Sequence, residues 1–411
     1  MSKTTLSYHH NSSSFTLIEL LIVIAILAVL MSVAVVAINP AEIMKKSRDT
    51  KRFNDIANLR DLILFANSEG LLNSTVCDGT KIYVSLPLST PLSNTNLPAG
   101  VSWVQVSEDN LRKSNGTGWI PLNLGNIYGV SMSTLPVDPQ NTLNDSLYYT
   151  FYCNPQRQYI LTSYMESKTF GPKGNETSKT NKDGGPDPYL YEVGNNLFIS
   201  PLKPVGSWSF DEGTGTIAND SSGNDNNGTL YGGPTWADGQ INKAISFDGV
   251  DDFVDIGIGN DYFPMSKFTL CSWIKSTEIG TASTPRGIIS ITYGLRLYLY
   301  PNGNLYFGIN TDPSTNTQAY ISYPQNLLDN KDHFVCASYD GTNANLFIDG
   351  ELKTSQAVGW GGTTLWPTVT AAIGWDVNNS PWKFKGLIDE PRIYNRSLSA
   401  EEIKRHYEMS K

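Results

Sequence analysis

Residues 14–37 read SFTLIELLIVIAILAVLMSVAVVA, a long apolar run that carries one carboxylate, Glu19, near its start. As a helix, residues 15–38 would extend about 36 Å at roughly 1.5 Å per residue, which is enough to cross the apolar core of a bilayer. A carboxylate in hydrocarbon is costly, so it indicates a functional group with a cationic partner. The run contains no Lys or Arg, and the partner must therefore come from elsewhere.

A cut between Ser14 and Phe15 would create such a partner, because it leaves a new α-amino group one helical turn from Glu19. Helix geometry directs this amine along the axis of its own chain. The amine of a neighbouring, axially shifted subunit is therefore the better partner. Glu19 would then fix the register of stacked helices.

The short polar leader followed by FTLIE resembles the N-terminal signature of type IV pilins and pseudopilins. The resemblance implies that prepilin peptidase removes residues 1–14, that Phe15 becomes the N-methylated first residue, and that Glu19 is required for assembly with other pilin subunits. The family usually has glycine before the cut, whereas this chain has Ser14. The resemblance also implies a single membrane span over residues 15–38, with the C-terminal domains outside the cytoplasm and on a pilus or cell surface after assembly.

Two alternatives for the apolar run remain open. A plain membrane anchor would not need Glu19, and a secretory signal peptide cut after VAVVA would have an unusually long apolar region. The positive charges favour the opposite orientation, because Lys3 alone precedes the run and five Lys or Arg follow it within residues 45–52. We give the motif precedence, since large domains are translocated largely regardless of charge.

The composition indicates turn-rich β structure beyond this run. The 411 residues, enough for two globular domains, include 35 Gly, 22 Pro, 21 Tyr and 9 Trp, and only 17% are charged. The net charge of −9 lacks the basic footprint of nucleic-acid binding, so we expect no nucleic acid as a partner. In an exported protein, Cys77 with Cys153 and Cys271 with Cys336 suggest one disulfide per domain, the alternative being buried free thiols.

Residues 39–199 are predicted to form a pilin-like domain of the α+β class. Asn39 can cap a helix with an apolar stripe, and short β runs follow from about residue 81. The resemblance to pilins implies that this helix packs on an antiparallel sheet. Asp183 and Asp187 lie in a later turn-rich loop, comparable to a loop that often holds calcium in the major pseudopilins; the alternative is that both are solvated turn residues.

Residues 200–206, SPLKPVG, are predicted to be a linker. Beyond them, alternating apolar runs with Asn-Gly and Asp-Gly turns indicate an antiparallel sandwich. Over residues 205–411, the segments WSFDEGTGT, AISFDGVDDFVDIG, ASYDGTNANLFIDGEL and GLIDEPRIYNRSLSAEEI, in this order, resemble a LamG-like, concanavalin A-like jelly roll. The resemblance implies a module that binds a sugar or another surface ligand.

The resemblance also implies a structural calcium ion, held by acidic residues of the first strand and of the IDE strand. The acidic residues within the family motifs are Asp211, Asp220, Asp248, Asp251 and Asp389. Some of them are expected simply to form turns. Aromatic rings can stack on sugar faces, and neighbouring amides can bond sugar hydroxyls, unless the tryptophans belong to the core. The ligand-binding candidates of these two kinds are Trp360, Trp366, Trp375, Asn378, Asn379 and Trp382.

We expect no catalysis from this domain. Glycanases of this fold place Glu-x-Asp-x-x-Glu on one strand, and no glutamate of this chain begins such a motif. Asp389 and Glu390 are adjacent, so strict alternation would point them to opposite faces of a strand. The sequence therefore favours a pilin-like subunit that displays an adhesion module for a glycan or a surface protein. A pseudopilin of a secretion or DNA-uptake machine, whose LamG-like domain binds a protein, and a secreted glycan hydrolase remain alternatives.

Overall fold

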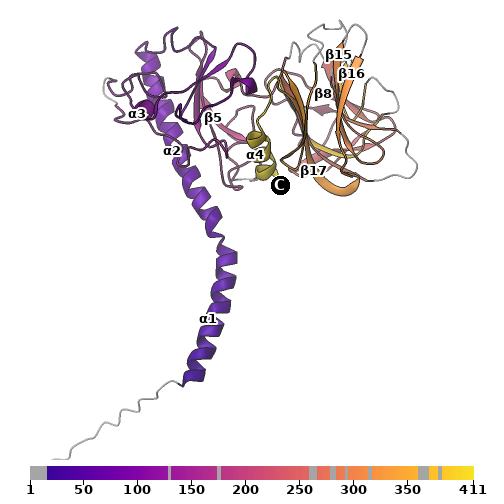
Figure 1. Ribbon diagram of the computed structural model, residues 1–411, viewed down its shortest axis with the longest axis horizontal. Helices are drawn as coiled ribbons and strands as arrows, with labels where there is room; N and C mark the ends of the chain where they lie inside the picture. The colour runs from indigo at the N-terminus through magenta and orange to yellow at the C-terminus, as the bar shows by residue number, and fades with distance from the viewer. Residues whose placement is uncertain are drawn as a thin grey trace, which may run out of the picture.

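The computed structural model describes residues 16–411, apart from eight short segments, and for a few residues it describes the backbone only. The segments outside the description are 128–130, 174–176, 259–265, 278–283, 292–294, 313–316, 360–369 and 378–381, and the residues described by backbone alone are 32–38, 310–312 and 317–318. The chain forms a helical stem, a mixed body and a β-sandwich (Figure 1). Ser14 and Phe15 lie outside the described residues.

Two helices in series form the stem and continue into the body. Helix α1 (Leu17–Ile38) begins with a reciprocal cap, in which the Thr16 N–H donates to Glu19 Oε2 over 2.9 Å and the Glu19 N–H donates to Thr16 Oγ1 over 3.3 Å. Asn39 interrupts the helix in the left-handed conformation, with φ at 45°, and caps helix α2 (Pro40–Ser68). The direction changes at this point (Figure 1). Among the described residues, no helix combines the length and the apolarity of a membrane span.

The body packs α2 against a five-stranded sheet in the order β2-β1-β3-β4-β5. The strands are β1 (Lys81–Val84), β2 (Ser102–Val104), β3 (Tyr149–Cys153), β4 (Tyr159–Tyr164) and β5 (Leu190–Gly194), and the short helices are η1 (Asn94–Asn96), α3 (Glu108–Leu111) and η3 (Leu197–Ile199). The apolar stripe of α2, including Ile56, Leu59 and Ile63, is fully buried against Phe151 of β3. The sheet was predicted to be antiparallel, but β1 and β2 run parallel.

Arg52 attaches α2 to the TLPVDP loop. Its guanidinium is fully buried, and it pairs with Asp138 over 2.6 Å, with Glu166 over 2.6 Å and with Asp49 over 2.8 Å. Breaking a buried ion pair by removing one partner typically costs about 3–5 kcal/mol. These ion pairs therefore connect α2 to the loop of Asp138 and to Glu166 after β4, and removal of one partner would leave a buried charge unpaired.

Within the described residues, the sandwich consists of two eight-stranded sheets, each built from antiparallel pairs. The first sheet contains β6 (Gly206–Ser207), β9 (Thr235–Asp238), β10 (Lys243–Asp248), β12 (Phe268–Thr277), β17 (Asp329–Tyr339), β18 (Asn343–Ile348), β19 (Glu351–Ala357) and β21 (Lys385–Tyr394). The second sheet contains β7 (Ile217–Ala218), β8 (Gly228–Tyr231), β11 (Phe253–Ile258), β13 (Arg286–Ile291), β14 (Leu295–Leu299), β15 (Leu305–Asp312), β16 (Thr317–Tyr323) and β20 (Thr370–Ile373). The predicted jelly-roll class is confirmed, with one apolar core between the sheets.

Both predicted disulfides are present, Cys77–Cys153 in the body and Cys271–Cys336 in the sandwich. Each joins strands or loops that already lie side by side in the fold, and Cys271 faces Cys336 directly across the β12–β17 pair. No cysteine is free. The alternative of buried free thiols is therefore wrong.

Helix α4 (Ala400–Ser410) lies between the first sheet and the body (Figure 1). On the sandwich side Ile403 packs against Trp273, and on the body side Met409 packs against Met165. The ring of His406 stacks on Tyr189 of the body, with the two centroids 4.0 Å apart. The two parts of the molecule are therefore joined by a packed, apolar junction as well as by the chain itself.

Residues 200–206 also take part in this junction. Leu202 is buried in a cluster of the body, and its carbonyl accepts a hydrogen bond from Arg396 Nε over 3.0 Å. The Val205 N–H donates to the Ile393 carbonyl over 2.7 Å. The segment predicted to be a linker thus packs against both parts.

Candidate ligand-binding face

The outer surface of the second sheet is the strongest candidate for a ligand site. Side chains alternate along each strand, so Leu295, Leu297 and Leu299 of β14 enter the core. Arg296 and Tyr298 of the same strand therefore point outward. Aromatic residues from several elements share this outer surface. They come from β8, β11, β14, the position after β14, β15, β16 and the segment between β20 and β21: Tyr231, Phe253, Tyr298, Tyr300, Tyr306, Tyr320, Trp375 and Trp382. We call this surface the aromatic face.

One end of the aromatic face is a group of mutually packed rings. The ring of Tyr306 lies 4.6 Å from that of Tyr300 and 5.5 Å from that of Tyr298, with interplanar angles of 30° and 26°. The ring of Trp382 lies 5.5 Å from that of Tyr298. Tyr298 is nearly buried beneath these neighbours, whereas Tyr300 is 40% exposed. The group therefore presents a firm, solvent-accessible apolar surface.

Arg296 positions Tyr320, the aromatic residue that β16 contributes to the face. Its guanidinium is almost buried, donates from Nη2 to the Tyr320 hydroxyl over 2.6 Å, and pairs through Nη1 with the fully buried Asp376 over 3.3 Å. The guanidinium also lies over the rings of Tyr320 and Trp382, 5.5 and 5.9 Å from their centroids. Tyr320, 47% exposed, is thereby held at the surface in one orientation.

Trp375 and Trp382 are positioned by backbone contacts between their segment and β13. The Asp376 and Gly287 N–H groups both donate to the Trp382 carbonyl, over 3.0 and 3.2 Å, and Ser290 Oγ donates to the Trp375 carbonyl over 2.6 Å. A Cβ at Gly287 would overlap the backbone of residues 375 and 376. Only glycine permits this close approach.

The other end of the face combines aromatic rings with a cation. The rings of Tyr231 and Phe253 are stacked 5.1 Å apart, and the Phe253 ring lies 4.9 Å from that of Trp375. Lys383 Nζ lies 3.9 Å from the Trp375 centroid and 4.1 Å from the Phe253 centroid. Partial burial lowers the pKa of Lys383, although nearby aspartates oppose this effect.

Those aspartates form a turn beside the face. Carboxylate oxygens of Asp248, Asp251 and Asp252 lie within 4.8 Å of one another, and Lys383 Nζ donates to the Asp251 carbonyl over 3.5 Å. Burial raises the pKa of Asp252. The turn already uses one oxygen of Asp248 for the Val250 N–H and one of Asp252 for the Asp248 N–H. The remaining oxygens are of the kind that calcium prefers.

The structure brings some predicted residues together and separates others. Asp248 and Asp251 share the acidic turn with Asp252, which the prediction missed although it directly follows Asp251 in the sequence. Asp220 instead organises a loop, since it accepts hydrogen bonds from backbone N–H groups of residues 207, 222 and 226. Asp211 lines the junction with Glu390, and Asp389 accepts a hydrogen bond from the Ile241 N–H over 2.8 Å. Trp360, Trp366, Asn378 and Asn379 lie outside the described residues.

The expectation for Asp389 and Glu390 is wrong, because strict alternation does not hold at this point of β21. The register against β12 shifts between the Cys271–Arg392 and Trp273–Asp389 pairs, and Glu390 adopts φ of 53°. Burial raises the pKa of Asp389, and the charge of Glu390 raises it further. The two carboxyl groups therefore influence one another electrostatically at a point where the alternation of β21 is interrupted.

Asp183 and Asp187 are not solvated turn residues. Asp183 accepts hydrogen bonds from the Gly185 and Glu192 N–H groups, each over 2.8 Å, and Asp187 is fully buried and accepts from the Tyr189 N–H over 3.0 Å. Burial raises the pKa of Asp183 to about 7. Both carboxylates organise the loop that leads into β5.

Comparisons with known proteins agree with this architecture. Residues 9–35 match the model of the prokaryotic N-terminal methylation motif, and residues 248–404 match the model of the concanavalin A-like lectin/glucanases superfamily. These matches confirm the predicted fusion. The chain thus combines a pilin-type N-terminal motif with a lectin-like sandwich. The motif is that of an exported protein that is anchored in a membrane or assembled at the surface.

Among solved structures, similarity was found to the binding domain of Paraclostridial Mosquitocidal Protein 1, with 16% identity, a TM-score of 0.40 and coverage of 50% of this chain and 51% of that chain. The receptor binding domain of botulinum neurotoxin C/D mosaic serotype is 20% identical, with a TM-score of 0.41 and coverage of 50% of this chain and 51% of that chain. Domain 4 of the arabinanase AbnA from Geobacillus stearothermophilus is 21% identical, with a TM-score of 0.37 and coverage of 51% of this chain and 99% of that chain. The chain thus spans about half the length of the first of these structures. No curated protein matches the chain.

Proposed function

We propose that this chain is a pilin-like filament subunit that displays a carbohydrate-binding module, with the aromatic face as the binding surface. The observation that carries the proposal is the pair of partly exposed ring groups, held in fixed orientations by the Arg296–Asp376 ion pair and by the contacts of Gly287. Flat sugar faces stack on such rings by apolar contact. Arg296 and Lys383 sit among the rings, where cations reinforce the aromatic surface.

Retention on a glycan array tests this surface, using full-length protein in a detergent without a sugar headgroup. We expect Trp382→Ala and Tyr300→Ala each to weaken retention about tenfold or more, because one lost stacking contact of about 1.4 kcal/mol corresponds to a factor of ten. Phe65→Ala is the matched control, since Phe65 is a partly exposed aromatic residue of α2. Equal retention by all three variants, or no retention by the parent protein, would contradict the proposal.

The stem is proposed to assemble the subunit. In this proposal residues 15–38 cross the membrane once before assembly, and the Glu19 carboxylate exchanges its bonds with Thr16 for the amino group of a neighbouring Phe15. Glu19→Gln should then be strongly depleted from sheared filaments, whereas the exposed Glu69→Gln should be incorporated normally. N-terminal sequencing of the mature protein should begin at methylated Phe15. Normal incorporation of Glu19→Gln would reject this role.

A calcium ion at the acidic turn is a further part of the proposal. The ion would use oxygens of Asp248, Asp251 and Asp252 and would order the edge of the aromatic face next to Lys383. Millimolar calcium should raise the melting temperature of the parent protein, and Asp251→Asn should reduce the shift. The control Asp238→Asn changes a well-exposed aspartate. An equal shift in both variants would locate the calcium elsewhere.

A further inference from the structure

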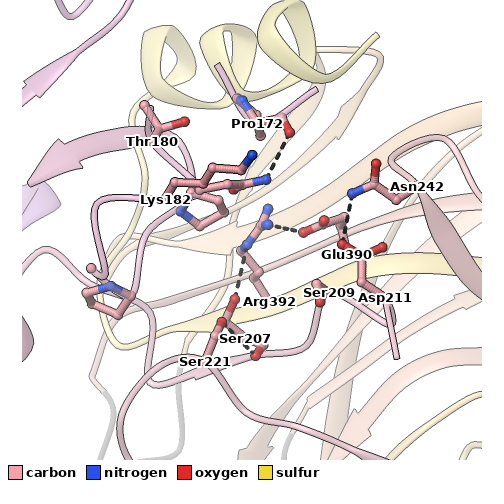
Figure 2. Close-up of a pocket in the computed structure, with 14 residues that line it drawn as sticks. Pro172, Thr180, Lys182, Ser207, Ser209, Asp211, Ser221, Asn242, Glu390 and Arg392 are labelled. Carbon is pink, nitrogen blue, oxygen red and sulfur yellow. Dashed lines mark hydrogen bonds and ion pairs between the residues drawn. The ribbon is translucent and has the colours of Figure 1, made fainter. Parts of the chain in front are cut away.

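A cavity of about 500 Å³ lies where the sandwich meets the body. One wall comes from Pro172 and residues 180–188 of the body, and the other comes from the sandwich, including β6 and β21 (Figure 2). The aromatic face belongs to the other sheet, so this junction cavity is a separate place on the molecule. It exists only because the two parts pack together.

Two almost fully buried charges line the cavity. Arg392 is 1% exposed and Glu390 is 2% exposed, and their side chains point toward one another and form an ion pair (Figure 2). Arg392 Nε also donates to Ser207 Oγ over 3.3 Å, and the guanidinium lies 4.5 Å above the ring of Tyr189. Arg392 Nη1 is buried and makes no hydrogen bond within the described part of the chain. An unmet buried donor of this kind indicates a missing partner.

The backbone around the cavity is strained at three places. Glu390, Phe210 and Asn242 have φ of 53°, 58° and 48°, in the left-handed region that non-glycine residues rarely adopt. Glu390 also precedes Pro391, and a residue before proline is normally extended. Glu390 and Asn242 line the cavity, and Phe210 lies between two lining residues. Such strain concentrates at ligand sites, where the surrounding structure holds it.

The lining as a whole mixes polar groups with proline rings, and its formal charges cancel. Lys182 and Arg392 balance Asp211 and Glu390. The other lining groups are hydroxyls, amides and proline rings: Ser207, Ser209, Ser221, Thr180, Asn181, Asn242, Pro172, Pro186 and Pro188. Carboxylates accept hydrogen bonds, the guanidinium donates them, and hydroxyls and side-chain amides do both. This mixture matches a neutral ligand rich in hydroxyl groups, and the volume lies within the usual range of about 300–1,000 Å³ for small-ligand sites.

We propose that the junction cavity is a second binding site, which takes a short neutral saccharide between the body and the sandwich. A sugar hydroxyl would accept from the Arg392 guanidinium, and others would meet Asp211 and Asn242, which line the same cavity. Because both walls must be in place, the site would form only in a chain in which the body and the sandwich are packed together. The proposal does not depend on the aromatic face.

Isothermal titration with maltose, cellobiose and lactose tests the cavity, using full-length protein in a zwitterionic detergent. The background variant is Trp382→Ala, in which binding at the aromatic face is weakened, and loss of the remaining binding in the cavity variants then distinguishes the two sites. In this background we expect at least one of the three disaccharides to bind saturably. Lys182→Ala and Ser209→Tyr, which remove a lining cation and fill the cavity, should each lower the affinity at least tenfold.

The matched control is Lys179→Ala, an exposed lysine of the same loop that does not line the cavity. It should leave the affinity unchanged. Thermal unfolding of each variant shows that the fold is kept. The proposal is overturned if none of the three disaccharides binds, if Lys182→Ala and Ser209→Tyr both bind as the control does, or if an anionic digalacturonate binds more tightly than the neutral sugars.

Discussion

At the scale of single residues, His333 shows how the charges of the sandwich respond to pH. The ring lies between two carboxylates at the start of β17, with Nδ1 2.9 Å from Asp349 and Nε2 3.2 Å from Asp329. Lys331 pairs with Asp329 from the same strand. The hydrogen bond with Asp349 raises the pKa of His333 and outweighs the opposing effect of burial.

A raised pKa in the folded state stabilises the protein at low pH. The contribution is fully present below the pKa of an unfolded histidine, about 6.5, and is lost as pH rises through the higher folded value. We expect the free energy of unfolding of His333→Gln to fall below that of the parent by about 1 kcal/mol at pH 5.5, with a smaller difference at pH 8.5. Chemical denaturation at both pH values measures it, and a pH-independent difference would contradict the prediction.

At the scale of elements, the aromatic face depends on how closely β13 approaches the segment between β20 and β21. Gly287 of β13 donates to the Trp382 carbonyl, and no side chain fits at this position. The tryptophans therefore depend on a residue that carries no ligand-binding group itself. A sequence search for aromatic or polar candidates does not find such a residue.

Gly287→Ala should displace this segment and weaken ligand retention about as much as removal of Trp382 does. Overpacking of this kind typically lowers the free energy of unfolding by about 1–3 kcal/mol, and chemical denaturation measures this loss. Gly359→Ala is the control, because open space surrounds Gly359. Unchanged stability and retention in Gly287→Ala would show that the segment tolerates the shift.

At the scale of the whole molecule, α4 packs against both the body and the sandwich and so holds the two parts together. The helix belongs to the sandwich by sequence, yet Met409 is buried among Tyr164, Met165 and Tyr189 of the body. Arg405 Nη1 donates to the Met165 carbonyl over 3.0 Å, and the Tyr164 hydroxyl lies 3.3 Å from His406 Nε2. A binding module held in this way would be presented in a fixed orientation.

Met409→Glu should uncouple the two parts, because it places a charge in an apolar contact and leaves no partner for it. The parent is expected to unfold in one cooperative transition, and the variant in two. Protease cleavage within residues 200–206 should become faster. Met44→Glu, at an exposed position of α2, serves as the control. If Met409→Glu behaves as Met44→Glu does, the junction contributes little to coupling.

Much of the architecture was predictable from sequence, because local patterns encode it. The leader with FTLIE, the capping position Asn39 and the alternating runs beyond residue 205 determine element types over short distances. The even division of four cysteines pointed to one disulfide in each domain. The alternating runs and tight turns indicated an antiparallel sandwich, and the resemblance to LamG-like domains implied the jelly roll.

The candidate sites depended on tertiary structure, because their parts come from distant segments. Only the folded sheet brings Tyr298 and Arg296 beside Trp382, and only the junction joins residues 180–188 to Arg392. The pattern of apolar residues also does not predict the irregular backbone at Glu390 or the close approach of Gly287 to the backbone of residues 375 and 376. Each is a local exception imposed by packing. Short-range patterns thus determine the elements of this chain, and long-range packing decides which side chains meet.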